Sequence, residues 1–188
     1  MPRTTHRQEG WLSEGGMELV APIFSFQQPN TWHAHIDSIW WVLTNKFNTW
    51  STEQCSTHVH ASPSEGQWTL SQIRNVAKAA LYFERSIDSV LPPSRRANIW
   101  CQSNRWNATF KSYEMPTLFS WIEQAGNIPH VAFLMCTFSK DSEYGKAMGH
   151  TQNIMFNAFR WNFTPLQEGS KETIEFRQPP GSGSANET

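Results

Sequence analysis

The sequence predicts an α+β fold, in which an antiparallel β-sheet is covered by helices on one of its faces. Two long segments carry apolar residues at spacings of three and four, which is typical of amphipathic helices. Several short strand-like segments do not alternate regularly with those helices, which argues against a parallel sheet. The chain has 188 residues, and its 13% of aromatic residues can fill a core although only 38% of the residues are apolar.

The first half of the chain contains two predicted strands and two predicted helices. In order, they are a strand at 17–26, a helix at 31–47, a short strand at 55–63 and a helix at 69–91. Thr31 is a suitable N-cap for the first helix, and Thr69 or Ser71 for the second, because a hydroxyl oxygen can accept a hydrogen bond from the first turn. Pro92 ends the second helix, because the residue before a proline disfavours helical backbone angles.

The second half is predicted to be richer in strands. After a mixed segment, we expect a helix at 117–125, a strand or apolar run at 131–138, a loop at 139–153 and strands around 154–163 and 172–177. Residues 1–15 are polar and are expected to be disordered, whereas 179–188 have the composition of a flexible tail. A single α+β domain is therefore expected to cover residues 16–178.

Composition and charge argue against several classes of function. The net charge is −1 and the basic residues are scattered, so neither nucleic acid nor a membrane surface is an expected partner. The sequence shows neither a run of about 18 apolar residues nor the apolar core of a signal peptide. The three cysteines form no CxxC pair, which argues against a structural zinc site and favours reduced thiols in the cytoplasm.

His58 and His60 form the first candidate site. Alternate residues of a strand face the same side, so the two imidazoles are expected to project together, with Cβ atoms about 7 Å apart, while Val59 points to the core. Such a pair could bind a metal ion or a phosphate. Alternatively, one of the two histidines is a hydrogen-bonded structural residue beside a loop.

Glu175 and Arg177 form the second candidate site, with Phe176 between them expected to pack inward. A carboxylate can bind Mg²⁺, and a guanidinium can bind a phosphate or a carboxylate through two parallel hydrogen bonds. The alternative is a salt bridge on a solvated strand face. Glu18, the one acid in an apolar strand, is either an exposed residue or a third member of the same site.

Arg95 and Arg96 follow the proline that ends the second helix. They could form a turn that binds a phosphate or a carboxylate, or they could lie in a solvated loop. Glu84, near the end of the second helix, is expected on the surface. His33 and His35 on the first helix are two residues apart and do not share a helix face, which argues against a metal pair there.

Taken together, five motifs resemble those of the amidoligases that are common in fungi. The resemblance spans about residues 14–182, and the motifs are MELVAP from Met17, CSTHVHAS from Cys55, FERSID from Phe83, PSRRAN from Pro93 and TIEFRQ from Thr173. That family is related to glutamine synthetase and glutamate–cysteine ligase. The resemblance implies a glutamine-synthetase-like antiparallel sheet whose funnel-shaped site binds ATP and two or more Mg²⁺ ions.

The resemblance also implies a reaction and the residues that perform it. ATP phosphorylates a substrate carboxylate, and an amine then displaces phosphate from the acyl phosphate to give an amide or peptide bond. By resemblance, the metal ligands would be Glu18, His58, His60 and Glu175. The nucleotide or acid substrate would be contacted by His58, Arg95, Arg96 and Arg177, and the transferring phosphoryl group would be acted on by His60 and Arg177.

Two further hypotheses compete with an active ligase. Family members usually carry another strand, with two alternating carboxylates, upstream of the Glu18 segment, and they continue beyond Arg177. We therefore expect a partial, truncated sheet, and a non-catalytic binding protein with the same fold is the main alternative. The other alternative is a hydrolase in which Glu18, His58 and His60 hold Zn²⁺.

Overall fold

The computed structural model describes residues 18–96, 98–167 and 172–188. The first half of the chain contains α1 (Pro29–Lys46), β1 (Val59–Ala61), α2 (Leu70–Val90) and α3 (Pro93–Arg96). The second half contains α4 (Met115–Gln124), α5 (Ile128–Cys136), β2 (Thr137–Phe138), α6 (Glu143–Ala147), β3 (Ile154–Met155), β4 (Trp161–Asn162), the 3₁₀ helix η1 (Thr164–Leu166), β5 (Ile174–Phe176) and the 3₁₀ helix η2 (Ala185–Glu187). These helices and small antiparallel sheets confirm the predicted α+β class.

Three short strands form the sheet that carries His60 and Glu175, and His58 and Arg177 directly adjoin two of them. Their order is β1–β5–β4, and both pairs are antiparallel. In this register, His60 of β1 and Asn162 of β4 lie on either side of Glu175 of β5. Strands β2 and β3 form a separate antiparallel pair. Because strands of two or three residues contribute few ladder hydrogen bonds, the sheet depends on the elements packed around it.

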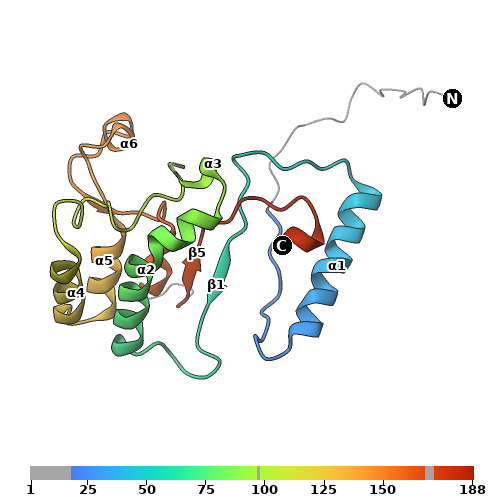
Figure 1. Cartoon of the computed structure of the whole chain (residues 1–188), viewed down its shortest axis with the longest axis horizontal. Coiled ribbons are helices and arrows are strands. Elements are labelled where there is room, and N and C mark those ends of the chain that lie inside the picture. Colours follow the sequence, from blue (N-terminus) through green and yellow to red (C-terminus); the bar gives the residue numbers. More distant parts are fainter. Residues whose placement is uncertain (1–17, 97, 168–171) are drawn as a thin grey trace.

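Helices α2, α4 and α5 pack together beside this sheet and form the main body of the molecule (Figure 1). Large apolar side chains from the three helices, from the segment between α2 and α4 and from the residues around β4 are fully buried there. They include Ile73, Leu81, Phe110, Leu118, Ile122, Val131, Met135, Phe159 and Phe163. Each such side chain contributes about 1.5–3 kcal/mol when it leaves water, so this core is the main force that fixes the short strands in place.

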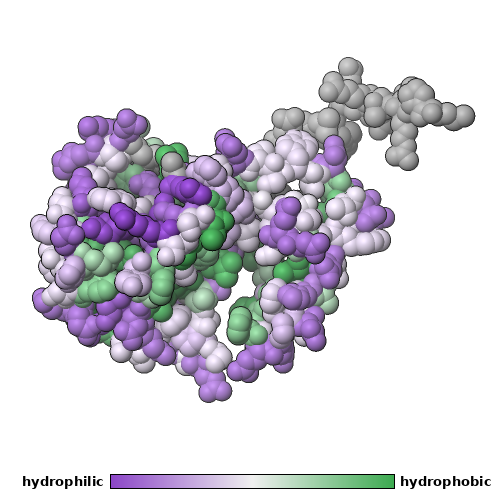
Figure 2. Space-filling view, in the orientation of Figure 1, coloured by the Kyte–Doolittle hydropathy of each residue, from purple (hydrophilic) through white to green (hydrophobic). Residues whose placement is uncertain are grey.

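Helix α1 lies on the other side of β1 from the main body (Figure 1). It contacts η2 at the C-terminal end of the chain, where Nε1 of Trp40 donates a hydrogen bond to Oγ1 of Thr188 at 2.9 Å. Figure 2 shows apolar surface on α1 and on the part of the body that faces it. Trp41 and Val42 of α1 and Val59 of β1 are among the exposed apolar side chains, so Val59 does not point to the core as expected.

The C-terminal segment pairs with the residues that precede β1. The amide of Thr57 donates to the carbonyl of Pro180 at 3.2 Å, and the amide of Gly181 donates to the carbonyl of Cys55 at 3.0 Å. Residues 179–188, for which the composition indicated a flexible tail, therefore connect the β1 side of the body to α1. In the described part of the chain, no helix has the length and apolar character needed to cross a bilayer.

The capping prediction is confirmed for α2 and wrong for α1. The hydroxyl of Thr69 accepts from the amide of Gln72, and the Gln72 side chain accepts in return from the amide of Thr69, which is a complete capping box. Helix α1 instead begins at Pro29, and Gln28 makes no capping hydrogen bond with its side chain. A proline fits the first turn of a helix because its missing N–H would have no partner there.

Among the described residues, two segments predicted as strands differ from the prediction. Residues 18–26 have no strand partner, and their apolar side chains, such as Val20 and Ile23, are exposed; Met17 lies outside the described residues. The segment predicted as a strand at 131–138 is mostly helix α5, which Asn127 caps through the amide of His130 at 2.8 Å. A short apolar run has no period that distinguishes a buried strand from a buried helix, so only its neighbours decide.

Other boundaries also changed. The loop expected at 139–153 contains α6, and the strand expected at 154–163 is divided into β3 and β4, which belong to different sheets. Glu84, expected on the surface, is 5% exposed because α2 turns that side toward the loop at 103–105 and toward Arg160.

Candidate functional site

Four of the predicted site residues lie together, with Glu175 in the central strand of the sheet and the other three around it. His58 and His60 approach it from the β1 side, and Arg177 is its neighbour two positions along the chain. Asn162 of β4 reaches it from the opposite side. We call His58, His60, Asn162, Glu175 and Arg177 the Glu175 cluster.

Hydrogen bonds to both carboxylate oxygens define the geometry of the Glu175 cluster. Oε1 of Glu175 lies 2.9 Å from Nδ1 of His58 and 2.7 Å from a terminal nitrogen of Arg177. Nε2 of His60 is farther from the same oxygen, at 3.6 Å. Oε2 accepts from Nδ2 of Asn162 at 2.7 Å. The Glu175 side chain is only 5% exposed, so these contacts replace nearly all of its hydration.

The electrostatics favour an ionised Glu175. Burial by itself would raise the pKa of this carboxyl, because a low-dielectric surrounding disfavours charge. Hydrogen bonds from His58 and Asn162, together with the positive charge and hydrogen bond of Arg177, outweigh burial and lower the pKa of Glu175 to about 2. Glu175 is therefore a fixed negative charge that orients the three donors around it.

The two histidines have different second partners. Nε2 of His58 lies 2.7 Å from the hydroxyl oxygen of Ser56. Nδ1 of His60 lies 2.9 Å from the hydroxyl oxygen of Thr173. Their side chains are 27% and 35% exposed, so both imidazoles can be reached from solvent whereas the carboxylate behind them cannot.

The remaining predicted site residues lie elsewhere. Glu18 is exposed in the extended segment before α1, and none of the described hydrogen bonds or ion pairs joins it to the Glu175 cluster. Arg95 is buried and donates to the main-chain carbonyls of Arg177 at 2.8 Å and Gln178 at 3.0 Å, so it braces the end of β5. Arg96 donates to the carbonyl of Leu91.

The donor set around Glu175 does not fit a metal ion in this arrangement. Mg²⁺ usually needs one or two carboxylates with free oxygen lone pairs, and both oxygens of Glu175 already accept hydrogen bonds. A divalent ion at Oε1 would also meet the positive charge of Arg177. Throughout residues 18–96, 98–167 and 172–188, no three His, Cys, Asp or Glu side chains are placed to hold a metal ion.

A second buried polar cluster lies next to the site. One terminal nitrogen of Arg160 is 3.1 Å from Glu84 and 2.9 Å from Asp88, and another donates to the carbonyl of Arg96 at 2.7 Å. Burial raises the pKa of Glu84, although Ser103 and Arg160 oppose the shift. This cluster connects α2 to Arg160, in the segment just before β4.

The sequence-based site omitted three residues that the fold brings in. Asn162 stands between two aromatic residues in a strand, and a polar residue in an apolar strand is a signal for a buried hydrogen bond. Ser56 and Thr173 reach the histidines from positions two residues before His58 and two before Glu175. Their period-two spacing is visible in the sequence, but it has meaning only once β1 and β5 are paired.

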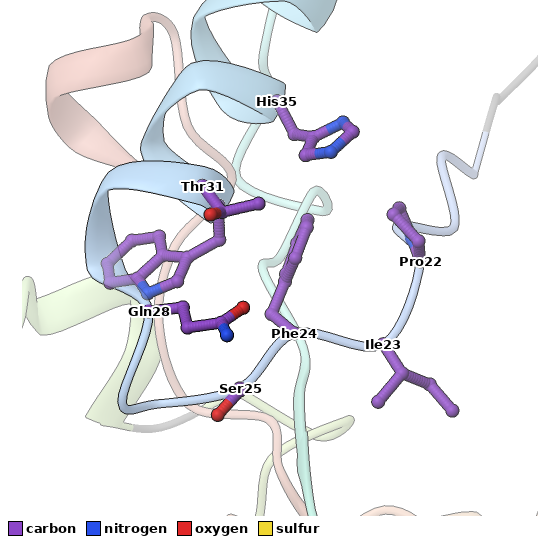
Figure 3. Close-up of a pocket in the computed structure, with 8 residues that line it drawn as sticks. Pro22, Ile23, Phe24, Ser25, Gln28, Thr31 and His35 are labelled. Atoms are coloured by element: carbon purple, nitrogen blue, oxygen red, sulfur yellow. The ribbon is translucent and has the colours of Figure 1, made fainter.

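One surface pocket lies elsewhere and contains none of the predicted site residues. It lies between the extended segment at 22–25 and the start of α1, where the ring centroids of Phe24 and His35 are 5.6 Å apart and the two rings are tilted (Figure 3). Its lining is mainly apolar or uncharged and offers no carboxylate or guanidinium. The Glu175 cluster thus remains the best-formed group of reactive side chains among the described residues.

A comparison with known families identifies the family of the chain. A family described as “putative amidoligase enzyme” has a model that matches residues 3–188. No curated protein and no solved structure matches the chain. The match covers nearly the whole sequence, including the three strands β1, β4 and β5, and the chain therefore belongs to this amidoligase family.

Proposed function

We propose that this protein is a carboxylate–amine ligase whose reaction takes place at the Glu175 cluster, with ATP as the activating nucleotide. The substrates would be a carboxylic acid and an amine, each a small molecule or a peptide. The observation that carries the proposal is the convergence of His58, His60 and Arg177 on one ionised carboxylate, in a chain that belongs to an amidoligase family.

The chemistry of the cluster supports phosphoryl transfer. Formation of an acyl phosphate requires positioning and charge neutralisation more than covalent participation by the protein. Arg177 is held in one orientation by Glu175, and its buried Nε has no hydrogen-bond partner among the described residues. His60 is partly exposed beside it. In the proposal, these two groups bind and steady the anionic oxygens, and Glu175, which contacts both, keeps them in place.

The cofactors of the proposal are ATP and Mg²⁺. Because the donor set does not fit a metal ion as it stands, the proposal assigns the ion no protein ligands and no step. Arg95 and Arg96 bind main-chain carbonyls in the structure, so the proposal gives them a supporting position and no direct contact with the nucleotide.

The test is an amide-forming assay on the purified chain. The protein would be incubated with ATP, Mg²⁺ and a panel of amino acids and short peptides, and products would be identified by mass spectrometry. We expect ADP, phosphate and a condensed product. We expect His60→Gln to lower its rate by about 10²-fold, because loss of one positioned donor typically costs that much. His130→Gln, in an exposed histidine at the start of α5, is the matched control.

The alternative is a binding protein that keeps the family fold without its chemistry. The specific observation in its favour is that both oxygens of Glu175 are occupied, so that no metal site is formed by the described residues. Isothermal titration with ATP distinguishes the two. Binding that requires Mg²⁺ and is weakened in Glu175→Gln supports the ligase, whereas the absence of nucleotide binding and of any condensed product supports the alternative.

A further inference from the structure

The geometry points to Ser56 as a second reactive group, a nucleophile that takes an acyl group from an activated ester of a small carboxylic acid. This reaction uses neither ATP nor an amine, although it shares His58 and Glu175 with the proposed ligase site.

Three side chains form a continuous relay that ends at Ser56. The hydroxyl oxygen of Ser56 lies 2.7 Å from Nε2 of His58, and Nδ1 of the same ring lies 2.9 Å from Oε1 of Glu175. A nucleophile bonded to a base, with that base oriented by a third group, is the arrangement that activates a serine. The two contacts use opposite nitrogens of one imidazole, as this mechanism requires.

The hydrogen bonds around Glu175 assign the proton positions in the relay. Asn162 and Arg177 both donate to Glu175, so its oxygens act as acceptors. Nδ1 of His58 therefore carries the proton of its bond to Glu175, and Nε2 of the neutral ring is an acceptor. The hydroxyl of Ser56 then donates to Nε2, which places the base where it can remove the proton of the nucleophile.

Burial along the relay suits the same role. The carboxylate is 5% exposed, the imidazole is 27% exposed, and Ser56 is half-buried. The Glu175 carboxylate, shielded from solvent, thus lies behind the His58 imidazole, which solvent can reach. Ser56 lies at the accessible end of the relay. The main chain of Ser56 is fixed by its antiparallel bridge to Pro180, so its position does not depend on the side-chain contact alone.

The reaction follows from these positions. The Ser56 oxygen attacks the ester carbonyl carbon while its proton passes to Nε2 of His58. The bond between the carbonyl carbon and the leaving oxygen breaks, and the alcohol departs with that proton. Water then attacks the acyl-serine, gives a proton to His58 and releases the free acid, and the proton returns to the Ser56 oxygen. No oxidant, reductant or further reactant is needed.

The experiment uses the full chain with a fluorophosphonate probe and with p-nitrophenyl acetate. We expect the probe to label Ser56, as located by peptide mass spectrometry, and Ser56→Ala to abolish labelling and acetate-ester turnover. Ser64→Ala, in an exposed serine near the end of β1, should change neither. His58→Gln should slow labelling of Ser56 by about 10²-fold or more, because a positioned general base contributes about 10²–10⁴.

Two results would overturn the assignment. One is labelling of Ser56 at the same rate as Ser51 and Ser64, and the other is an unchanged rate in a folded His58→Gln variant. Circular dichroism establishes whether that variant folds. If it does not, ¹⁵N-histidine NMR of the parent chain decides, since a proton on Nδ1 of His58 supports the relay and a proton on Nε2 contradicts it.

Discussion

Glu175 accepts hydrogen bonds from three side chains although it is almost completely buried. A buried charge of this kind is tolerated only when partners replace the lost hydration. The partners come from both neighbouring strands, so the carboxylate also fixes the register of β1 and β4 on β5. Any change at this one position should therefore affect both the stability of the sheet and the orientation of the site.

The low pKa of Glu175 predicts a loss of stability in acid. Its pKa is lowered from an ordinary value of 4.5 to about 2 in the folded protein, so the unfolded chain binds the proton first as the pH falls. The stabilisation by this carboxylate is complete above pH 4.5 and is lost as the pH falls toward 2. In Glu175→Gln, we expect a lower free energy of unfolding at neutral pH and a smaller decrease over that range.

Urea unfolding at a series of pH values, followed by tryptophan fluorescence, measures both effects. Glu65→Gln, which removes an exposed carboxylate, is the matched control and should keep the pH dependence of the parent. If Glu175→Gln loses stability with acid as steeply as the parent, the ionised cluster is not present in solution.

At the scale of the elements, the helices follow local signals where those signals are complete. Helix α2 has apolar residues at helical spacing, a capping box at Thr69 and two prolines after its end, and its predicted limits are within one residue of the observed ones. The segment predicted as a strand or apolar run at 131–138 contains no start signal within those bounds and is mostly helix α5. Its start signals, Asn127 and Pro129, lay just before the run that suggested a strand.

The capping box of α2 gives a prediction for an isolated element. Thr69→Ala removes the hydroxyl that accepts from the amide of Gln72, and we expect a loss of about 1 kcal/mol in the free energy of unfolding. Ser71 lies two residues further along the chain and is exposed, so Ser71→Ala should change the free energy of unfolding by less than about 0.5 kcal/mol. Chemical denaturation of the two variants measures the difference, and equal effects would mean that the cap does not form.

At the scale of the whole molecule, the C-terminal segment connects parts that are far apart in the sequence. It pairs with residues 55–57, just before His58 and β1, and η2 contacts α1. Gly181 is in close contact there with Cys55 and Ser51, and an added Cβ would overlap both side chains. Only glycine allows the two backbones to approach this closely.

This close approach predicts what an added methyl group at position 181 does to the contact between the C-terminal segment and residues 55–57. In Gly181→Ala, we expect the C-terminal segment to separate from residues 55–57. The amides of Thr57 and of residue 181 should then exchange faster with deuterated solvent than in the parent. Gly126→Ala is the control, because a Cβ there would meet no atom within 4 Å. Unchanged exchange at Thr57 would show that the segment is not held by this contact.

The sequence by itself determined the fold class, the helix α2 and the pairing of chemistry-bearing residues two positions apart on a strand. These features depend on local periodicity and capping, which neighbouring residues encode. It also indicated the amidoligase family, because the motifs of that resemblance can be read in order along the chain.

Only the tertiary structure decided which of those motifs meet. Strand pairing brings His58, His60 and Asn162 to Glu175, leaves Glu18 exposed on an unpaired segment and turns Arg95 inward to brace β5. The order of strands and the helix formed at 128–136 depend on contacts between residues distant in sequence. The free energy of those contacts comes from burial in a shared core, and no local pattern records which partners will share it.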